Sequence, residues 1–212
     1  MSDADSRQKR CYLPGRMNFC SQCGGKTEQR IPNGEDRHRA VCTLCSTVHY
    51  LNPKMIVGCI IEHDGQIMLC KRAIEPRYGF WTIPAGFMEI GESAMQGAAR
   101  ESHEEATAHV RIIAPYAHFD VTHIAQAYIV YRAELIVPET GPAYAPGTES
   151  LEVKLVRPSE IPWGELAFGA VKQALELYTE DVARGRYRCH LGSIHREDGR
   201  FVLKEHIALP VG

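Results

Sequence analysis

Residues 86–108, which read GFMEIGESAMQGAARESHEEATA, decide the fold of the chain. A loop opens the stretch and a helix follows it. Ser93 with Gln96 three residues later has the form of a capping box, which predicts a helix from about Ser93 to Ala106. Three carboxylates stand at i, i+3 and i+4, so they share one face of that helix: Glu101, Glu104 and Glu105.

Three adjacent carboxylates repel one another unless cations neutralise them, and such hard oxygen ligands favour Mg²⁺ or Mn²⁺. A solvated acidic face, with Arg100 paired to a neighbouring glutamate, is the alternative for a Glu-rich helix considered alone. Gly97 stands one turn before Glu101, where a side chain would crowd a ligand. Packing against a sheet is expected through the opposite face: Met95, Ala99, Ser102 and Ala106.

The larger pattern resembles the Nudix box, G-x5-E-x7-R-E-U-x-E-E-x-G-U, in which U is a bulky aliphatic residue. Six of its residues are in register: Gly86, Glu92, Arg100, Glu101, Glu104 and Glu105. Ser102 and Ala108 are smaller than the aliphatics of the family, which favours looser helix packing. Thr107 replaces a glycine that would accept a positive φ at the helix end, so we expect this helix to end differently.

The resemblance implies a role for each residue of the box. The metal ligands would be three glutamates, with help from the Gly86 carbonyl: Glu101, Glu104 and Glu105. Glu92 would hold Arg100, and Arg100 would orient a metal-binding glutamate. The metals would screen phosphate charge and lower the pKa of the attacking water.

A further base would come from a box glutamate or from a loop after the box. Glu149 and Glu152 are the candidates in that loop, and Glu149 is preferred because it stands at the loop edge rather than within a strand. An exposed loop acid is the alternative for Glu149. Three aromatic residues are candidates to stack on adenine or flavin: Phe80, Trp81 and Phe119. For Phe80 and Trp81 the alternative is a place in the core.

Two Cys-x-x-Cys pairs, separated by 18 residues, precede the box: Cys20, Cys23, Cys42 and Cys45. Four thiolates suit tetrahedral Zn²⁺, and the metal would replace the core that a segment with few large aliphatics cannot build. Because cysteine fills all four positions, the site would be closed and structural. Two disulfides or solvent-exposed thiols are the alternatives.

The expected domain organisation has four parts: a disordered segment or linker at 1–16, a zinc ribbon at 17–50, a Nudix domain at 51–184 and a tail of unassigned role at 185–212. Strands are expected at 55–63 and 66–72 around an Asp-Gly turn, and at 110–118, 124–136 and 150–156. A second helix is expected from Glu165 to Arg184. The resemblance implies an α/β (α+β) fold, the Nudix α/β/α sandwich with a mixed sheet.

A ribbon ahead of a Nudix domain resembles two subgroups, the NADH pyrophosphatases and the ADP-ribose or FAD pyrophosphatases of the plant chloroplast type. The first group usually carries an SQPWPFPxS signature after the box, whereas residues 114–135 read APYAHFDVTHIAQAYIVYRAEL. FCSQCGG, NPKMIVGCIIEHDG and PGTESLEVKL look like the second group. We therefore expect Mg²⁺- or Mn²⁺-dependent hydrolysis of ADP-ribose or FAD with release of AMP. The alternatives are an NADH or NAD-cap pyrophosphatase, and a non-catalytic nucleotide-binding or zinc-ribbon interaction module.

The bulk composition bounds the partners. The formal net charge of the 212 residues is -2, which does not favour nucleic acid, so a small-molecule nucleotide is the expected partner. The longest apolar run, Met55 to Ile61, is shorter than the roughly 20 residues that span a bilayer. Without a secretory signal, a cytoplasmic, reducing compartment is expected. A homodimer is compatible with the resemblance, because ribbon-bearing relatives often pair.

Overall fold

The computed structural model describes residues 17–211, and the linker expected at 1–16 lies outside them. The chain forms two compact units that divide between Pro53 and Lys54. The first unit contains an antiparallel sheet in the order β1-β2-β3, with β1 at Thr27–Arg30, β2 at Arg39–Cys42 and β3 at Val48–His49. Its buried apolar side chains are few and small: Cys20, Ala40, Val41 and Cys42. A core of this size cannot hold the unit together by itself.

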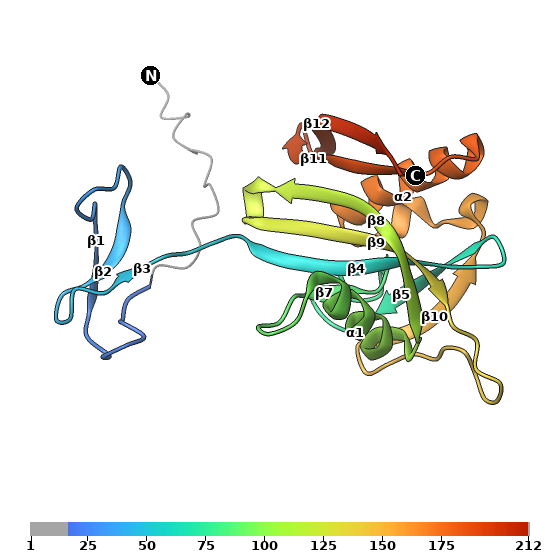
Figure 1. Ribbon diagram of the computed structural model, residues 1–212, viewed down its shortest axis with the longest axis horizontal. Coiled ribbons are helices and arrows are strands. Elements are labelled where there is room, and N and C mark those ends of the chain that lie inside the picture. Colours follow the sequence, from blue (N-terminus) through green and yellow to red (C-terminus); the bar gives the residue numbers. More distant parts are fainter. Residues whose placement is uncertain (1–16, 212) are drawn as a thin grey trace, which may run out of the picture. The chain divides into compact units, whose positions relative to one another are not determined.

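The second unit is built on a nine-stranded mixed sheet (Figure 1). Its main path runs β10-β5-β4-β9-β8-β11-β12, while β6 pairs with β5 and β7 with β4. The strands are β4 (Lys54–His63), β5 (Gln66–Arg72), β6 (Trp81–Thr82), β7 (Ala85–Phe87), β8 (Val110–Val121), β9 (Gln126–Leu135), β10 (Ser150–Val156), β11 (Arg188–Glu197) and β12 (Arg200–Pro210). The helices are α1 (Ala94–Ala106) and α2 (Gly169–Arg184), with 3-10 turns at Thr122–Ile124, Pro158–Glu160 and Trp163–Glu165.

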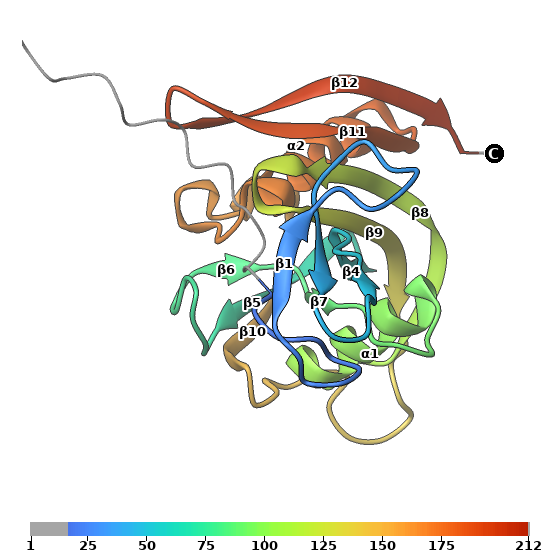
Figure 2. The same ribbon diagram turned by 90° about the vertical axis from the view of Figure 1, so that its left-hand side faces the viewer.

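Strand β4 shows why the sheet needs a helix on each face. Its side chains alternate between two cores: Ile56 and Ile60 pack in the core that includes α2, whereas Val57, Cys59 and Ile61 pack in the core that includes α1. Figures 1 and 2 show α1 and α2 on opposite faces of the sheet. The predicted α/β/α sandwich with a mixed sheet is confirmed. Among the described residues, the helices are too short or too polar to cross a bilayer.

The start of α1 follows the prediction, and its end corrects it. Ser93 accepts a hydrogen bond from the Gln96 N–H while the Gln96 side chain accepts one from the Ser93 N–H, which completes the capping box. Thr107 was expected to avoid the left-handed conformation, yet it adopts it, with φ 49° and ψ 17°. Its N–H reaches the carbonyls of His103 and Ser102, as a C-cap glycine would do. The helix therefore ends as in the family pattern, with a β-branched residue held in a costly conformation.

The packing face of α1 also differs from the prediction. Met95 is 52% exposed, and Ala99 is only half-buried. Ser102 and Ala106 are fully buried as predicted, and Ala98 is fully buried beside them. The Ser102 hydroxyl is satisfied there, because it donates to the Ala98 carbonyl at 2.7 Å.

Helix α2 begins four residues later than predicted, at Gly169 instead of Glu165. The reason lies in the sheet. Leu166 forms a bridge with Trp81, and the Ala167 N–H donates to the Trp81 carbonyl at 2.8 Å, so this segment is extended. A helical window cannot reveal a pairing with a strand so distant in sequence.

The C-terminal tail, which has no role in the sequence-based interpretation, completes the sheet. Strands β11 and β12 form an antiparallel hairpin, and β11 runs parallel to β8 (Figure 1). The turn between them is Asp198-Gly199, with φ values of 47° and 79°. Asp64-Gly65 has nearly the same geometry between β4 and β5, at 47° and 73°. The second Asp-Gly pair was therefore the available signal for this hairpin.

Candidate active site

A cavity of about 780 Å³ in the second unit gathers the carboxylates of α1 with one from the loop before β10. Four predicted site glutamates line it: Glu101, Glu104, Glu105 and Glu149. Gly86 lines it as well, and Glu152 does not. The structure therefore brings together the residues that the box pattern and the loop-edge argument singled out.

The carboxylates of α1 are not equally placed. Glu104 is exposed, whereas Glu101 and Glu105 are buried, with 8% and 5% of their surface accessible. Burial raises the pKa of Glu105 to about 8, with a further increase from the negative charge of Glu101. Burial likewise raises the pKa of Glu101, against the lowering effect of Arg100. Oε2 of Glu105 is buried and has no hydrogen-bond partner among the described residues. An unpaired, buried carboxylate oxygen in an acidic cluster fits a bound cation.

Arg100 binds three carboxylates at once. Its Nε and Nη2 donate to Glu92 at 3.0 and 2.8 Å, and its Nη1 donates to Glu101 at 2.8 Å and Glu104 at 2.7 Å. Nη2 also donates to the Phe87 carbonyl at 3.0 Å. The hydrogen bonds from Arg100 are the main reason why the pKa of Glu92 is lowered to about 2. The Glu92–Arg100 pair thus fixes the rotamers of Glu101 and Glu104, the role that the resemblance implies.

Two glycines leave room for these side chains. A Cβ on Gly86 would lie 2.4 Å from the Glu101 carboxylate. A Cβ on Gly97 would lie 2.6 Å from Oε1 of Glu92 and 2.8 Å from Val57. The expectation that Gly97 makes room for a ligand is therefore corrected, because the space is filled by the carboxylate that holds Arg100.

The loop that carries Glu149 is fixed to the end of α1. The N–H groups of Ala145 and Gly147 donate to the carbonyls of Ala106 and Glu105, both at 2.9 Å. These carbonyls belong to the last helical turn and have no partner within the helix. The close approach requires glycine at 147, because a Cβ there would lie 1.7 Å from the Glu104 carbonyl oxygen. Sequence analysis missed this function of Gly147.

The aromatic residues proposed for substrate stacking lie elsewhere. Trp81 and Phe119 are 3% and 0% exposed and belong to the hydrophobic core, and Phe80 packs under the Arg77 guanidinium. None of the three lines the cavity. The expectation is corrected, since Trp81 on β6 and Phe119 on β8 pack in the core that includes α2. The aromatic residues that do line the cavity are Phe87, Tyr128 and Phe168.

Arg72 is a cavity residue that sequence analysis missed. It is the last residue of β5, is 8% exposed, and lies with its guanidinium 5.0 Å from the centroid of the Phe168 ring. Its Nε donates to the Pro76 carbonyl at 2.9 Å, which fixes its position. The positive charge of Arg72 partly opposes the effect of burial, which raises the pKa of Glu105. The signal available in the sequence was a Lys-Arg pair at the end of the apolar run IMLC of β5.

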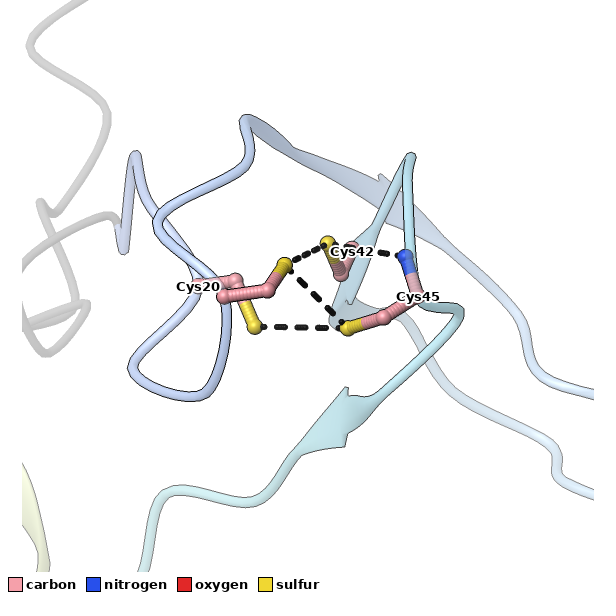
Figure 3. Close-up of side chains that lie close together, drawn as sticks. Cys20, Cys42 and Cys45 are labelled. Carbon is pink, nitrogen blue, oxygen red and sulfur yellow. Dashed lines mark hydrogen bonds between the residues drawn. The ribbon is translucent and has the colours of Figure 1, made fainter.

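In the first unit, one sulfur cluster joins both Cys-x-x-Cys pairs. The Sγ atoms of Cys20, Cys23, Cys42 and Cys45 lie within 4.8 Å of one another. Figure 3 shows three of them, on Cys20, Cys42 and Cys45, pointing toward a common centre. The buried His49 lies with Nε2 3.2 Å from Cys20 Sγ, and the N–H groups of Leu44 and Cys45 both donate to Cys42 Sγ at 3.4 Å. Four converging sulfurs with N–H partners fit structural Zn²⁺.

Comparison with known proteins gives the same two units. The Nudix N-terminal zinc-ribbon model matches residues 18–51, and the NUDIX domain model matches residues 52–178. A protein of Vibrio parahaemolyticus named NAD-capped RNA hydrolase NudC is 28% identical over 77% of this chain and 62% of its own length. A protein of the same name from Photobacterium profundum is also 28% identical, over 76% and 59%. The chain thus spans about three fifths of the length of these curated relatives.

Solved structures agree with the family models. A NUDIX hydrolase from Nitrosomonas europaea is 49% identical, with a TM-score of 0.79 over 84% of this chain and 99% of that one. An ADP-ribose pyrophosphatase from Streptococcus suis is 19% identical, with a TM-score of 0.54 over 66% and 99%, and shows the likeness of the fold alone. With its box glutamates gathered in one cavity and both family models matched, this chain belongs to the Nudix hydrolase family, with a zinc ribbon at its N-terminal side.

Proposed function

We propose that the chain hydrolyses the pyrophosphate of an ADP-linked small molecule, with NADH as the first candidate substrate. The observation that carries this proposal is the group of six glutamates that line one cavity, among them the four predicted site residues and the unpartnered, buried Oε2 of Glu105. A degenerate domain that only binds nucleotides has no need of buried carboxylates that repel one another. The arrangement favours a catalyst over a binding module.

The chain's own residues divide the work. Glu101, Glu104 and Glu105 would hold the divalent cation that the family requires, together with the Gly86 carbonyl. When bound, such a cation neutralises phosphate charge and lowers the pKa of water. Glu92 and Arg100 keep the first two carboxylates in place. Glu149, which lines the same cavity, would accept the proton of the attacking water at its carboxylate oxygen.

Arg72 would bind the phosphate oxygens from the side of the cavity away from α1. Its guanidinium is held between the Pro76 carbonyl and the Phe168 ring, so little rotamer freedom is lost when an anion binds. This placement would balance the charge that the carboxylates and phosphates bring into one site.

The substrate choice rests on two observations that point to different subgroups. The curated relatives are named for NAD-capped RNA, which supports NADH, and RNA with an NAD cap, over the plant chloroplast type expected from the sequence. These names also reopen nucleic acid as a partner. ADP-ribose and FAD stay the second candidates, because residues 114–135 lack the signature usual in the NADH group.

The test is AMP release from NADH, ADP-ribose and FAD, and NMN release from NAD-capped RNA, each with Mg²⁺ or Mn²⁺. Glu104→Gln is the matched variant, since Glu104 is exposed and its loss should leave the fold intact. We expect the variant to lose roughly 100-fold in kcat/KM on whichever substrate the wild type prefers. A wild type that cleaves none of the four contradicts the proposal, and so does full activity in the variant.

We further propose that residues 17–50 form a zinc-stabilised ribbon and that the catalytic unit extends past residue 184 to include β11 and β12. The homodimer stays a prediction, and gel filtration with and without a zinc chelator tests whether the ribbon supports it.

A further inference from the structure

A second, smaller cavity opens beside the catalytic one. Its volume is about 210 Å³, and it shares four lining residues with its larger neighbour: Pro76, Ile124, Tyr128 and Phe168. The two cavities are therefore adjacent, so a molecule held at the carboxylates lies next to the side cavity. We propose that the side cavity binds one planar heterocycle of the substrate, adenine or the reduced nicotinamide ring, and thereby sets substrate specificity. The inference rests on the proposed function.

The side cavity is lined mostly by apolar and aromatic residues, which suit an aromatic ring, and Arg77, whose guanidinium lies 5.1 Å from the centroid of the Phe80 ring, is the cation among them. Phe168, Tyr128 and Phe201 offer aromatic surface, and Ile194 is an apolar neighbour. Flat apolar walls of this kind bind ring faces by stacking. The described residues that line the cavity include no carboxylate, which disfavours a metal ion or a cationic ligand.

His123 supplies the polar contact that such a ring would need. It lines the side cavity, and its Nδ1 is buried without a hydrogen-bond partner among the described residues. Buried nitrogens without partners are rare in folded proteins, so this atom calls for a ligand. Nδ1 donates or accepts according to the tautomer, and a ring nitrogen, an amino group or a carboxamide can pair with either form. The His123 ring lies over Phe201, with centroids 6.3 Å apart and planes tilted by 33°.

The C-terminal hairpin contributes side chains to the side cavity. Phe201 comes from β12 and Ile194 from β11, so the hairpin forms one wall of the side cavity. The position of that wall is set by Gly169 at the start of α2, because a Cβ there would lie 2.3 Å from Cγ of Phe201. Residues that complete the sheet edge thus also shape the specificity site.

The experiment measures the dissociation constants of AMP and of NMN in its reduced form, which carries the neutral ring of NADH, for the full chain in the presence of Mg²⁺, by calorimetry. The variants are His123→Leu, which removes the nitrogen, His123→Asn, which restores a polar atom near the position of Nδ1, and Phe201→Leu, which removes the ring. His118→Leu is the matched control, because His118 is an exposed histidine on β8 outside both cavities. Thermal unfolding midpoints verify that each variant is folded. The Michaelis constants for NADH and ADP-ribose are measured for the wild type and for each variant.

We expect His123→Leu to weaken the binding of one mononucleotide by about fivefold to tenfold, and His123→Asn to restore that affinity. Phe201→Leu should weaken the same mononucleotide by about tenfold, the usual effect of losing a stacking partner. An effect on AMP identifies adenine as the occupant, with parallel increases in KM for NADH and ADP-ribose. An effect on NMN identifies nicotinamide, with an increase for NADH alone.

Unchanged affinity for both mononucleotides in folded His123→Leu and Phe201→Leu overturns the inference, as does a wild type that binds neither. Failure of the proposed function looks different, because the wild type would then bind a mononucleotide through His123 and cleave none of the four substrates.

Discussion

Replacing Gly147 by alanine tests how the chain holds its proposed base. Gly147 donates its N–H to the Glu105 carbonyl at 2.9 Å, and Ala145 donates to the Ala106 carbonyl at the same distance. The added Cβ would lie 1.7 Å from the Glu104 carbonyl oxygen and 2.8 Å from its carbon, which are backbone atoms of a packed helix. The loop must therefore move away by more than an ångström, and both hydrogen bonds are lost.

The expected cost follows from these contacts. Two backbone hydrogen bonds contribute about 1 kcal/mol each, and the forced displacement adds a comparable amount, so we expect a loss of about 2–4 kcal/mol. For a unit of this size the midpoint of thermal unfolding should fall by about 5–15 °C. Glu149 follows two residues later, and a displacement of about 1 Å at a reacting group lowers the rate by roughly 100-fold.

The assay combines thermal unfolding with kcat on the preferred substrate, measured well below the unfolding midpoint. Gly164→Ala is the control, because no atom lies within 4 Å of its added Cβ. We expect this control to unfold and turn over like the wild type. A Gly147→Ala variant with wild-type midpoint and rate would refute the docking of the loop on α1. A lower midpoint with unchanged kcat would refute the part of the argument that makes Glu149 the base.

Three further perturbations follow from the structure. Thr107→Gly should raise the free energy of unfolding by about 0.5–1 kcal/mol, measured by urea titration, because glycine accepts the left-handed conformation; an unchanged or lower value contradicts it. The metal-free protein should lose thermal stability between pH 4.5 and 8, because the pKa of Glu105 rises from 4.5 to about 8 on folding, so its stabilising contribution is complete below pH 4.5 and lost as the pH passes 8. Mg²⁺ should reduce this slope, and an equal slope in Glu105→Gln would contradict the assignment. His49→Ala should weaken zinc binding by about 10–100-fold in a chelator competition assay, since the ring contacts Cys20; wild-type affinity would show that the contact has no influence.

Local signals in the sequence were sufficient where the structure is local. The capping box at Ser93 and the Asp-Gly turn at 64–65 place α1 and the first hairpin correctly, because capping and turn geometry depend on a few adjacent residues. The same applies to the box glutamates, whose spacing puts them on one helix. Glu149 lies in the same cavity, and its position at the edge of a loop was the reason for choosing it from the sequence. The contacts that hold this loop in place come from Gly147.

Tertiary contacts decided the remaining features. Trp81 is equally compatible with a stacking site and a core position until its strand pairs with Leu166 and turns the ring inward. Thr107 disfavours a positive φ in isolation, but its N–H satisfies the helix end and its hydroxyl donates to the Ala145 carbonyl at 3.3 Å. Packing and hydrogen bonding of the loop thus outweigh the intrinsic preference of one residue. Neither outcome is encoded within a short window of sequence.

The buried position of Glu101 and Glu105 explains why this helix is a poor structural element and a good metal site. A helix that only covered a sheet would bury aliphatic residues where these carboxylates lie, since an uncompensated buried charge costs several kcal/mol. Arg100 compensates Glu101 at 2.8 Å, but Oε2 of Glu105 has no partner among the described residues, so Glu105 must be protonated or meet a cation. The same burial that raises the pKa of Glu105 therefore couples metal binding to proton release. Because Mg²⁺ competes with that proton, the affinity for the metal should increase from pH 6 to 8, and the increase should be absent in Glu105→Gln.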